Sequence, residues 1–339
     1  MPKTIRNIFD QKLTFEKLIE AEERASLGKK KRKEIILFEM DLETNITKIL
    51  NEIKSGNYRF GNYREFIIYE PKKRLIKSLP YRDRIVHQWY IVEFIKPFYF
   101  PRFIRDSYAC IDNRGTHAAV LRVQKYMRKM KKTYGNYYVL KCDIKKFFYS
   151  INIDILISIL SKKIKDKKLF EFTKLILQSK DKKGIPIGNY TSQFFANIYL
   201  NELDYYIKDV LKIKYYVRYM DDFILLLDNK EKAKEVNKKI NDYVCSKLDL
   251  ELNRKIRYYP SKEGIDFCGY RIFENYILLR KRFKRKMKKT IKKWNKLYHD
   301  NKINMKKMEL SYNSFLAHAS HANSYNYICK IKDEIKNIK

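Results

Sequence analysis

The chain has 339 residues, with 75 lysines and arginines against 39 aspartates and glutamates, and a formal net charge of +36 at pH 7. Such an excess of positive charge repels itself unless an anionic partner neutralises it, which argues against an enzyme for small neutral substrates and points to nucleic acid. Hydrophobic residues make up 45% of the chain and aromatic residues 15%. This composition excludes intrinsic disorder as a description of the whole chain.

The sequence shows no sign of a membrane span, a secretory signal or a disulfide framework. It contains no run of about 18 apolar residues, and its N-terminal segment lacks both the apolar core and the small-residue cleavage site of a signal peptide. The five cysteines are widely spaced and never form a CxxC pattern. These features predict a cytoplasmic protein, in a reducing compartment, that makes no use of a membrane.

The N-terminal third is expected to combine helices with a strand pair. Apolar side chains recur at helical spacing over residues 38–53, which predicts an amphipathic helix. Over residues 64–95, short β-rich runs separated by Pro71 and Pro80 give way to a helical pattern. This pattern predicts a strand pair followed by a helix.

The middle of the chain is expected to alternate strands with helices. The apolar run YYVLKCDI over residues 137–144 predicts a buried strand that ends at Asp143. Two apolar runs interrupted by Asp221 and Asp222 predict a hairpin over residues 214–228. The remaining patterns predict helices over 154–178, 191–211 and 232–248, a loop over 182–188 and a second hairpin over 265–273.

A strongly basic segment runs from Arg280 to Lys296. Eleven of its seventeen residues are basic and none is acidic. The spacing of its few apolar residues predicts one narrow stripe on an otherwise cationic helix. The stripe consists of Phe283, Met287, Ile291 and Trp294.

An acidic pair inside an apolar hairpin needs an explanation in so basic a chain. Burying the adjacent carboxylates of Asp221 and Asp222 is unfavourable unless a cation compensates them. Asp143 could join them if the two strands are neighbours. Such carboxylates suit Mg²⁺, and two ions about 3.5–4 Å apart can activate an attacking oxygen and stabilise a leaving one in phosphoryl transfer. The alternative is that the pair forms a turn and that Asp143 is a surface or capping residue.

The residues around these aspartates resemble the motifs of reverse transcriptases. The YMDD of residues 219–222 resembles their YxDD box, and the KCDIKKFF of residues 141–148 resembles their first palm aspartate motif. The resemblance covers about residues 60–275. Three further segments resemble motifs of the bacterial branch, in order: RDRIVHQ (82–88), LNRK (252–255) and FCGYRI (267–272).

This resemblance implies the α+β right-hand polymerase fold, with fingers, a palm with an antiparallel sheet and a short helical thumb. It implies RNA-directed DNA polymerase activity. We expect residues 1–135 to form N-terminal helices and the fingers, residues 136–275 the palm, and residues 276–339 a basic helical thumb. A fingers-type helical insertion is expected at about residues 154–183.

The resemblance also implies roles at the acidic centre. Asp143, Asp221 and Asp222 would be catalytic and would hold two Mg²⁺ ions, with Mn²⁺ able to substitute. Asp143 and Asp221 would bridge both ions, and the backbone carbonyl of Ile144 would be an extra ligand. Lys255 matches the candidate proton donor to the departing pyrophosphate, but a surface lysine fits that position equally well.

A second group of residues is expected to bind the incoming nucleotide. Lys73 and Arg74 would clamp its triphosphate, and Arg74 is the better candidate. Phe148 matches the bulky residue that blocks a ribose 2′-hydroxyl, with ordinary core packing as the alternative. Three residues of a later segment complete the group: Ile187, Gly188 and Gln193.

Primer and template contacts are expected from several basic residues. Arg82 and Arg84 would either touch the template or close a salt bridge with Asp83, and the sequence leaves both interpretations open. The basic thumb helix would grip the backbone of the primer–template duplex. The other candidates for these contacts are Tyr219, Gly269, Arg280, Lys281, Arg282, Lys284 and Arg285.

A narrower resemblance is to the reverse transcriptases of diversity-generating retroelements. Most reverse transcriptases carry a QGxxxSP-type loop, whereas this chain has IGNYTSQ at residues 187–193. Segments 107–124 and 314–326 also resemble that subfamily. Ile187 replaces a hydrogen-bonding glutamine with an aliphatic side chain, which should weaken discrimination between nucleotides. The subfamily resemblance implies error-prone copying, chiefly opposite template adenines.

The same resemblance implies the partners and the setting. The partners would be a template-repeat RNA, its cDNA, deoxynucleoside triphosphates and a small basic oligomeric accessory variability protein, in a bacterial, phage or archaeal-type host. Three alternatives stay open. The chain could be a retron-like or intron-like bacterial reverse transcriptase, a template-independent defence polymerase, or a nucleic-acid-binding protein that kept the fold but lost catalysis.

The histidines give less guidance. His318 and His321 lie three residues apart and could pair on a metal, but no cysteine or acidic ligand accompanies them. Core or phosphate-facing positions suit them better. His87 and His117 are interpreted as structural or RNA-facing.

Overall fold

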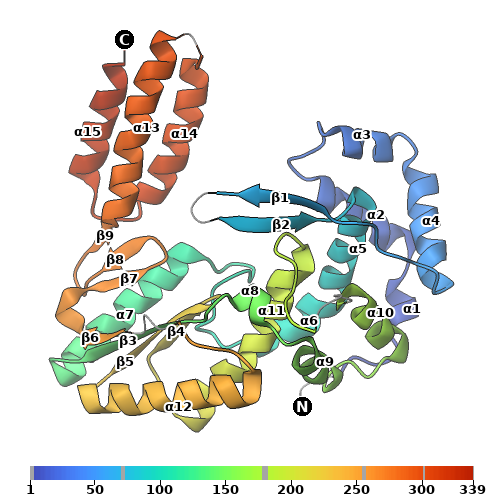
Figure 1. Ribbon diagram of the computed structural model, residues 1–339, viewed down its shortest axis with the longest axis horizontal. Coiled ribbons are helices and arrows are strands. Elements are labelled where there is room, and N and C mark those ends of the chain that lie inside the picture. Colours follow the sequence, from blue (N-terminus) through green and yellow to red (C-terminus); the bar gives the residue numbers. More distant parts are fainter. Residues whose placement is uncertain (1–3, 70–72, 178–181, 254–256, 301, 339) are drawn as a thin grey trace. The chain divides into compact units, whose positions relative to one another are not determined.

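The computed structural model describes residues 4–69, 73–177, 182–253, 257–300 and 302–338 (Figure 1). The chain forms two compact units, and each is built from three separate segments. The first unit contains Met1–Arg105, Ile144–Lys212 and Lys239–Asn253, and the second contains Asp106–Asp143, Ile213–Lys238 and Arg254–Lys339. No helix within the described ranges is both long enough and apolar enough to cross a membrane.

The first unit is mainly helical. Its α2 begins after Thr14, whose side chain accepts a hydrogen bond from the Lys17 N–H (3.3 Å), and α2 packs against α5. A π-helical turn, Ile91–Ile95, continues α5. The helices of this unit are α1 (Phe9–Lys12), α2 (Phe15–Ser26), α3 (Lys33–Glu39), α4 (Leu42–Lys54), α5 (Tyr81–Tyr90), α6 (Lys96–Tyr99), α8 (Phe147–Ser150), α9 (Ile153–Ser161), α10 (Lys167–Leu177) and α11 (Tyr190–Tyr205).

The amphipathic helix predicted over residues 38–53 is found as α4, with Ile46, Ile49 and Ile53 buried, but its predicted start at residue 38 is too early. α3 ends at Glu39 and α4 begins at Leu42. Asp41 between them leaves the helical region of backbone space (φ −134°, ψ 53°), and aspartate is favoured at such helix starts. The apolar spacing runs on across the break, so periodicity alone does not reveal it.

The predicted strand pair and the helix after it are confirmed. β1 (Arg64–Ile68) pairs antiparallel with β2 (Arg74–Ser78), and α5 begins directly after Pro80. Pro80 lies between the end of β2 and the start of α5, and its fixed φ suits the entry into a helix. All five residues of β1 are exposed, whereas four of the five residues of β2 are half-buried.

A four-stranded antiparallel sheet in the second unit positions the acidic residues. Its strand order is β4-β5-β3-β6. The predicted strand over residues 137–144 and the predicted hairpin over residues 214–228 are confirmed. Phe223–Leu227 are all buried, which explains why this strand reads as an unbroken apolar run. The strands are β3 (Tyr138–Asp143), β4 (Tyr216–Tyr219), β5 (Asp222–Leu227) and β6 (Arg257–Pro260).

A second antiparallel sheet has the order β7-β8-β9 and includes the predicted hairpin over residues 265–273. The basic segment forms α13, whose stripe residues Met287, Ile291 and Trp294 are buried as predicted. Helices α13, α14 and α15 lie side by side (Figure 1) and share one hydrophobic core with this sheet. The bounds are α7 (Thr116–Tyr134), β7 (Ile265–Phe267), β8 (Tyr270–Ile272), β9 (Ile277–Leu279), α13 (Lys281–His299), α14 (Met305–Ala319) and α15 (Tyr325–Lys336).

The predicted α+β class is confirmed by these antiparallel sheets and the helices around them. The predicted helix over residues 232–248 is α12 (Lys230–Leu248), which passes from the second unit into the first. The assignment of residues 1–135, 136–275 and 276–339 to fingers, palm and thumb stays a prediction.

Candidate active site

Asp143 and Asp222 face each other across two neighbouring strands. Asp143 is the last residue of β3, Asp222 is the first residue of β5, and the two are register partners. On its other side Asp222 pairs with Tyr219, the last residue of β4. Met220 and Asp221 therefore form the two-residue turn of the β4-β5 hairpin. The fold thus brings the two aspartate motifs, far apart in sequence, to the same end of the sheet.

The turn of this hairpin is strained and is supported by a buried arginine. Met220 has φ +56°, a left-handed conformation that costs a residue with a side chain about 1–2 kcal/mol. Arg218 is fully buried, and its Nη1 donates a hydrogen bond to the Met220 carbonyl (3.1 Å). We did not predict a role for Arg218. A basic residue inside an apolar strand beside an acidic pair was the available signal.

Lys141 provides a second positive charge at this site. It lies two residues before Asp143 on β3, so both side chains are on the same face of the sheet. Its Nζ lies 3.2 Å from Asp222 Oδ2 and also donates to the Asp266 carbonyl. The sequence motif contains Lys141 but gave no reason to pair it with Asp222, because that pairing depends on the register of β3 with β5.

The environment of Asp222 favours a bound cation. Burial raises the pKa of Asp222 to about 6, although Lys141 acts in the opposite direction. Its Oδ1 is buried and accepts no hydrogen bond from any residue that the structure describes. A buried carboxylate oxygen without a partner is unfavourable, and a hard divalent cation would satisfy it.

The residues at this end of the sheet therefore fit a divalent ion, but they do not form a preformed cage. Over the described ranges, no group of three or more His, Cys, Asp and Glu residues is arranged so that it could hold a metal. Asp143 and Asp222 are the opposed pair, with Asp221 in the adjoining turn. Ile144 follows Asp143 in the chain but belongs to the first unit, where it pairs with Leu252. Metal binding by these four residues stays a prediction.

In the first unit, backbone hydrogen bonds hold the loop that carries Ile187. The Lys77 N–H on β2 donates to the Ile187 carbonyl (2.8 Å), and the Ile185 N–H donates to the Phe148 carbonyl (2.8 Å). Gly188 has φ +125°, and a Cβ atom there would lie 2.5 Å from the Lys77 carbonyl oxygen. Only glycine fits this close approach. The structure thus joins the loop that carries the predicted nucleotide-site residues Ile187 and Gly188 to β2 at Lys77, and to Phe148 through Ile185.

The other predicted nucleotide-site residues are not joined to this loop by any hydrogen bond described above. Lys73 and Arg74 are exposed at the start of β2, and Arg74 pairs with Ile68. Arg74 is three residues from Lys77, or about 10 Å along the strand. Gln193 is half-buried in the first turn of α11. Lys255, the candidate proton donor, lies outside the described residues.

Arg82 and Arg84 have ion-pair partners, but Asp83 is not the main one. Arg82 pairs with Glu52, and Arg84 pairs with Glu34. The distance from Arg82 Nε to Asp83 Oδ1 is 4.0 Å, at the limit for an ion pair. Asp83 is fully buried and accepts hydrogen bonds instead from the Tyr58 hydroxyl and the Gly61 N–H. The expected pairing with Asp83 is therefore marginal for Arg82, and a template contact stays a prediction for both arginines.

Gly269 forms the turn between β7 and β8, against helix α14. It has φ +92°, and a Cβ atom there would lie 3.0 Å from the His318 ring. The Arg280 N–H donates to the Gly269 carbonyl (3.4 Å), and the Arg280 Nε lies 3.5 Å from Asp266 Oδ1. The turn at Gly269 is thus joined to the start of the basic helix.

The basic residues of α13 do not all face solvent. Lys281, Arg282 and Arg285 are exposed. Lys284 is half-buried, with its Nζ over the ring of Tyr327 (5.2 Å) and its carbonyl accepting the Tyr327 hydroxyl (3.0 Å). Lys284 therefore holds α15 as well as being a candidate for a phosphate contact.

Three histidines that are separated in sequence form one cluster in the second unit. The rings of His117 and His321 stack with centroids 3.5 Å apart, and the His318 ring stacks on Tyr270 at 4.3 Å. The Tyr270 hydroxyl donates to the His318 carbonyl (2.7 Å). The stacking of these rings favours a structural role over a metal pair, although His117 and His318 are only half-buried and His321 is exposed. His87, by contrast, is a core residue, and burial lowers its pKa to about 3.

Comparison with known proteins agrees with this geometry. Residues 69–272, more than half of the chain, match the family described as reverse transcriptase (RNA-dependent DNA polymerase). The group II intron-encoded protein LtrA of Lactococcus lactis subsp. cremoris is 27% identical over 185 residues, 51% of this chain and 29% of that protein. A COX1/OXI3 intron 2 protein of Saccharomyces cerevisiae is 23% identical over 285 residues, 64% of this chain and 30% of that protein. The chain spans less than a third of these relatives.

A solved structure resembles the fold. The telomerase of Candida tropicalis, in complex with a TWJ fragment of telomeric RNA, matches with a TM-score of 0.51 and 14% identity over 74% of this chain and 52% of that one. This likeness confirms the predicted polymerase fold. Together with the match over residues 69–272, it leads to one conclusion: the chain belongs to the reverse transcriptase family of RNA-dependent DNA polymerases.

Proposed function

We propose that this chain is the error-prone polymerase of a diversity-generating retroelement, which copies a template-repeat RNA into adenine-mutagenised cDNA. The observation that supports polymerase chemistry is the pairing of Asp143 with Asp222 beside the strained turn at Met220. The observation that supports the subfamily is Ile187 in a loop whose backbone is fixed by Lys77.

The proposed reaction is nucleotidyl transfer. The primer 3′-hydroxyl loses its proton to solvent, and its oxygen forms a bond to the α-phosphorus of a deoxynucleoside triphosphate. The bond from that phosphorus to the bridging oxygen breaks, and pyrophosphate leaves. Two Mg²⁺ ions, when bound, would neutralise charge on the attacking and leaving oxygens. Asp143, Asp221 and Asp222 are the residues proposed to hold them. Lys141 offsets part of the negative charge of Asp222 while substrates are absent.

The fixed loop explains how one side chain could set the error rate. The hydrogen bonds from Lys77 to Ile187 and from Ile185 to Phe148 hold both carbonyls in place. The Ile187 side chain can therefore offer the nascent base pair only its shape, because it has no donor or acceptor. Phe148 is proposed to exclude the ribose 2′-hydroxyl from the same nucleotide, and Lys73 or Arg74 to contact its triphosphate.

The mutation spectrum tests this proposal. The enzyme should copy an RNA template with errors concentrated opposite adenines, and Ile187→Gln should reduce those errors severalfold by restoring a polar contact. Ile187→Val is the matched control, because it keeps an aliphatic side chain and should keep the adenine bias. Sequencing of cDNA made with the native RNA and accessory protein measures both. Equal fidelity at all four template bases would contradict the subfamily assignment.

The second candidate is an intron-like reverse transcriptase, which the similarity to group II intron-encoded proteins favours. That enzyme would copy adenines as faithfully as the other bases, so the same sequencing experiment separates the two. A retron-like enzyme would behave in the same way. Extension of a primer without any template would instead support a template-independent defence polymerase.

A further inference from the structure

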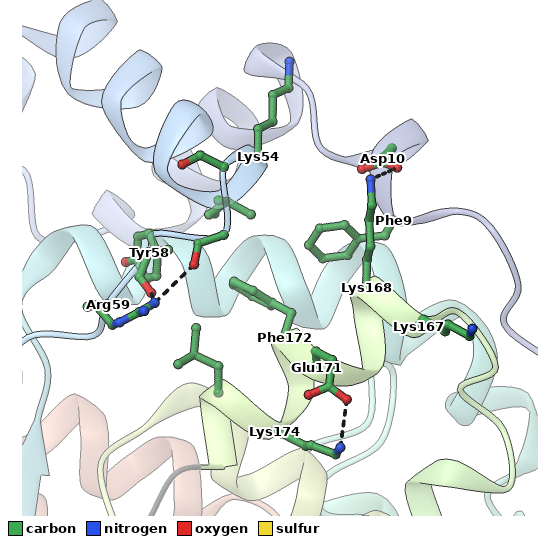
Figure 2. A pocket seen from close by; sticks show the side chains of 14 residues that line it. Phe9, Asp10, Lys54, Tyr58, Arg59, Lys167, Lys168, Glu171, Phe172 and Lys174 are labelled. Carbon is green, nitrogen blue, oxygen red and sulfur yellow. Dashed lines mark hydrogen bonds and ion pairs between the residues drawn. The ribbon is translucent and has the colours of Figure 1, made fainter.

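A pocket on the first unit has none of the residues assigned above to the active site in its lining (Figure 2). Its volume is about 640 Å³, within the range typical of ligand sites. Its walls come from α1, from the end of α4 with the turn that follows, and from α10. It is therefore a candidate binding site that polymerase chemistry does not explain.

The floor of the pocket is apolar and aromatic. Phe172 on α10 lies at its centre in Figure 2, and its ring is 5.6 Å from that of Phe9 and 6.3 Å from that of Tyr58. Ile53 and Leu175 complete the apolar lining. A flat aromatic ligand would bury apolar surface against this floor.

The rim of the pocket is cationic. The lining includes five basic residues and two acidic ones. Both acidic side chains are already paired, Asp10 with Lys168 (2.6 Å) and Glu171 with Lys174 (2.8 Å). The rim therefore keeps an excess of positive charge. Among described residues, no ion pair involves the remaining cations: Lys54, Arg59 and Lys167.

Asp166 holds two walls of the pocket together. Its carboxylate is buried and accepts hydrogen bonds from the N–H groups of Ile8 (2.8 Å) and Phe9 (2.9 Å) at the start of α1. The same carboxylate accepts from the Leu169 N–H in the first turn of α10 (3.1 Å). Because these bonds fix α1 against α10, the pocket is formed before a ligand arrives, which lowers the entropic cost of binding.

We propose that this pocket binds one unpaired nucleotide of a single-stranded RNA, with the base on the apolar floor and the neighbouring phosphates on the lysine rim. Base stacking and phosphate contacts are the two interactions by which proteins hold single strands. The net charge of +36 also favours a polyanion over a peptide. This proposal rests on the proposed function in one respect, because it requires that the enzyme binds a long RNA.

Photocrosslinking tests the proposal on the full chain. The probe is a ten-nucleotide single-stranded RNA with one 4-thiouridine, and mass spectrometry locates the crosslinked peptide. We expect crosslinks in residues 53–59 or 167–175. Lys54→Ala with Lys167→Ala should weaken RNA binding about tenfold at 0.1 M salt, because each phosphate contact releases counterions, and should remove the crosslink.

The matched control is Lys234→Ala with Lys238→Ala, which removes the same charge from the exposed side of α12. It should leave the crosslink in place. An equal loss in both double variants would overturn the proposal, as would crosslinks only outside the two segments. Equal crosslinking by a duplex of the same length, or competition by adenosine monophosphate at the same phosphate concentration, would overturn binding of an unpaired base within a strand. Displacement of the RNA by an acidic peptide at an equal charge concentration would also overturn it.

The outcome is separable from that of the proposed function. The variant with Lys54 and Lys167 replaced should extend a primer on a short template within twofold of the wild type. A variant with Asp221→Asn and Asp222→Asn should lose extension but keep the crosslink. If only the crosslinking result differs from the expected one, the polymerase assignment stands. If only the primer-extension result differs, the assignment of the pocket as an RNA site stands.

Discussion

The hairpin turn at Met220–Asp221 and the loop at Ile187–Gly188 both reverse the chain direction tightly, but they differ in which residue adopts the left-handed backbone conformation. Both place residues with a predicted role in catalysis or nucleotide binding on a tight change of chain direction with positive φ. In the loop, that conformation falls on Gly188, whose backbone packs against the Lys77 carbonyl. In the hairpin it falls on Met220. Two residues later in the chain lies Asp222, whose pKa burial raises to about 6.

The difference indicates where the fold tolerates unfavourable local energy. The loop is relaxed and hydrogen-bonded, which suits a surface that must present one fixed shape. The hairpin combines backbone strain at Met220 with a buried carboxylate oxygen on Asp222 that has no hydrogen bond within the described residues. Strain and unsatisfied charge collect at functional sites because the ligand relieves them.

Gly188→Ala would break the loop and should have the largest effect on stability. The added Cβ would lie 2.5 Å from the Lys77 carbonyl oxygen, so we expect a loss of about 2–4 kcal/mol in the free energy of unfolding. Gly56→Ala is the control, because Gly56 also has a positive φ (+74°, against +125° at Gly188) but no atom within 4 Å of the added Cβ. It should cost about 1 kcal/mol. Equal losses in urea denaturation would show that the close approach is unimportant.

Asp222→Asn should stabilise the protein without metal while it lowers activity. Since the folded-state pKa of Asp222 is raised to about 6, the fold loses stability as pH rises from about 4 to 6. Asparagine avoids this loss, so the variant should be about 1–2 kcal/mol more stable at pH 7 and equally stable at pH 4.

Thermal unfolding in EDTA across this pH range provides the measurement for Asp222→Asn. Asp249→Asn is the opposite control. Its hydrogen bonds from Lys183 and Asn152 lower the pKa of Asp249, so its replacement should destabilise at pH 7. If the wild type is as stable as Asp222→Asn at pH 7, the claim that the buried charge of Asp222 destabilises the fold is contradicted.

Met220→Gly should have the smallest effect. Glycine adopts positive φ without the steric cost that methionine has, so the variant should gain about 0.5–1 kcal/mol. Met220→Ala keeps the strain and removes the side chain, and it should show no gain. The midpoints of denaturant unfolding compare the two variants. A gain in stability in Met220→Ala but not in Met220→Gly would show that the methionine side chain, and not the backbone strain, is destabilising.

Much of the fold followed from local pattern. The runs around Asp143 and Asp222 identified two buried strands, and the spacing from Phe283 to Trp294 identified a helix with a narrow buried stripe. The break between α3 and α4 was missed because apolar spacing continues through Asp41. Local periodicity reports which face is buried but not where a backbone turn interrupts it.

The residues that sequence reasoning missed all depend on tertiary pairing. Lys141 acquires its role only when β3 and β5 align, and Arg218 only when the hairpin turn closes above it. Asp166 joins α1 to α10 across more than 150 positions of sequence. Charged residues with distant partners carry no periodic signal, which is why the motifs predicted the aspartates and not their supports.

The most direct test of the account is primer extension on an RNA template as a function of Mg²⁺ concentration. The wild type should extend the primer with deoxynucleotides in a Mg²⁺-dependent manner. The variant with Asp221→Asn and Asp222→Asn should be at least about 10³-fold slower, while its affinity for the RNA stays within twofold. Extension by that variant within tenfold of the wild-type rate would contradict the assignment of catalysis to these carboxylates.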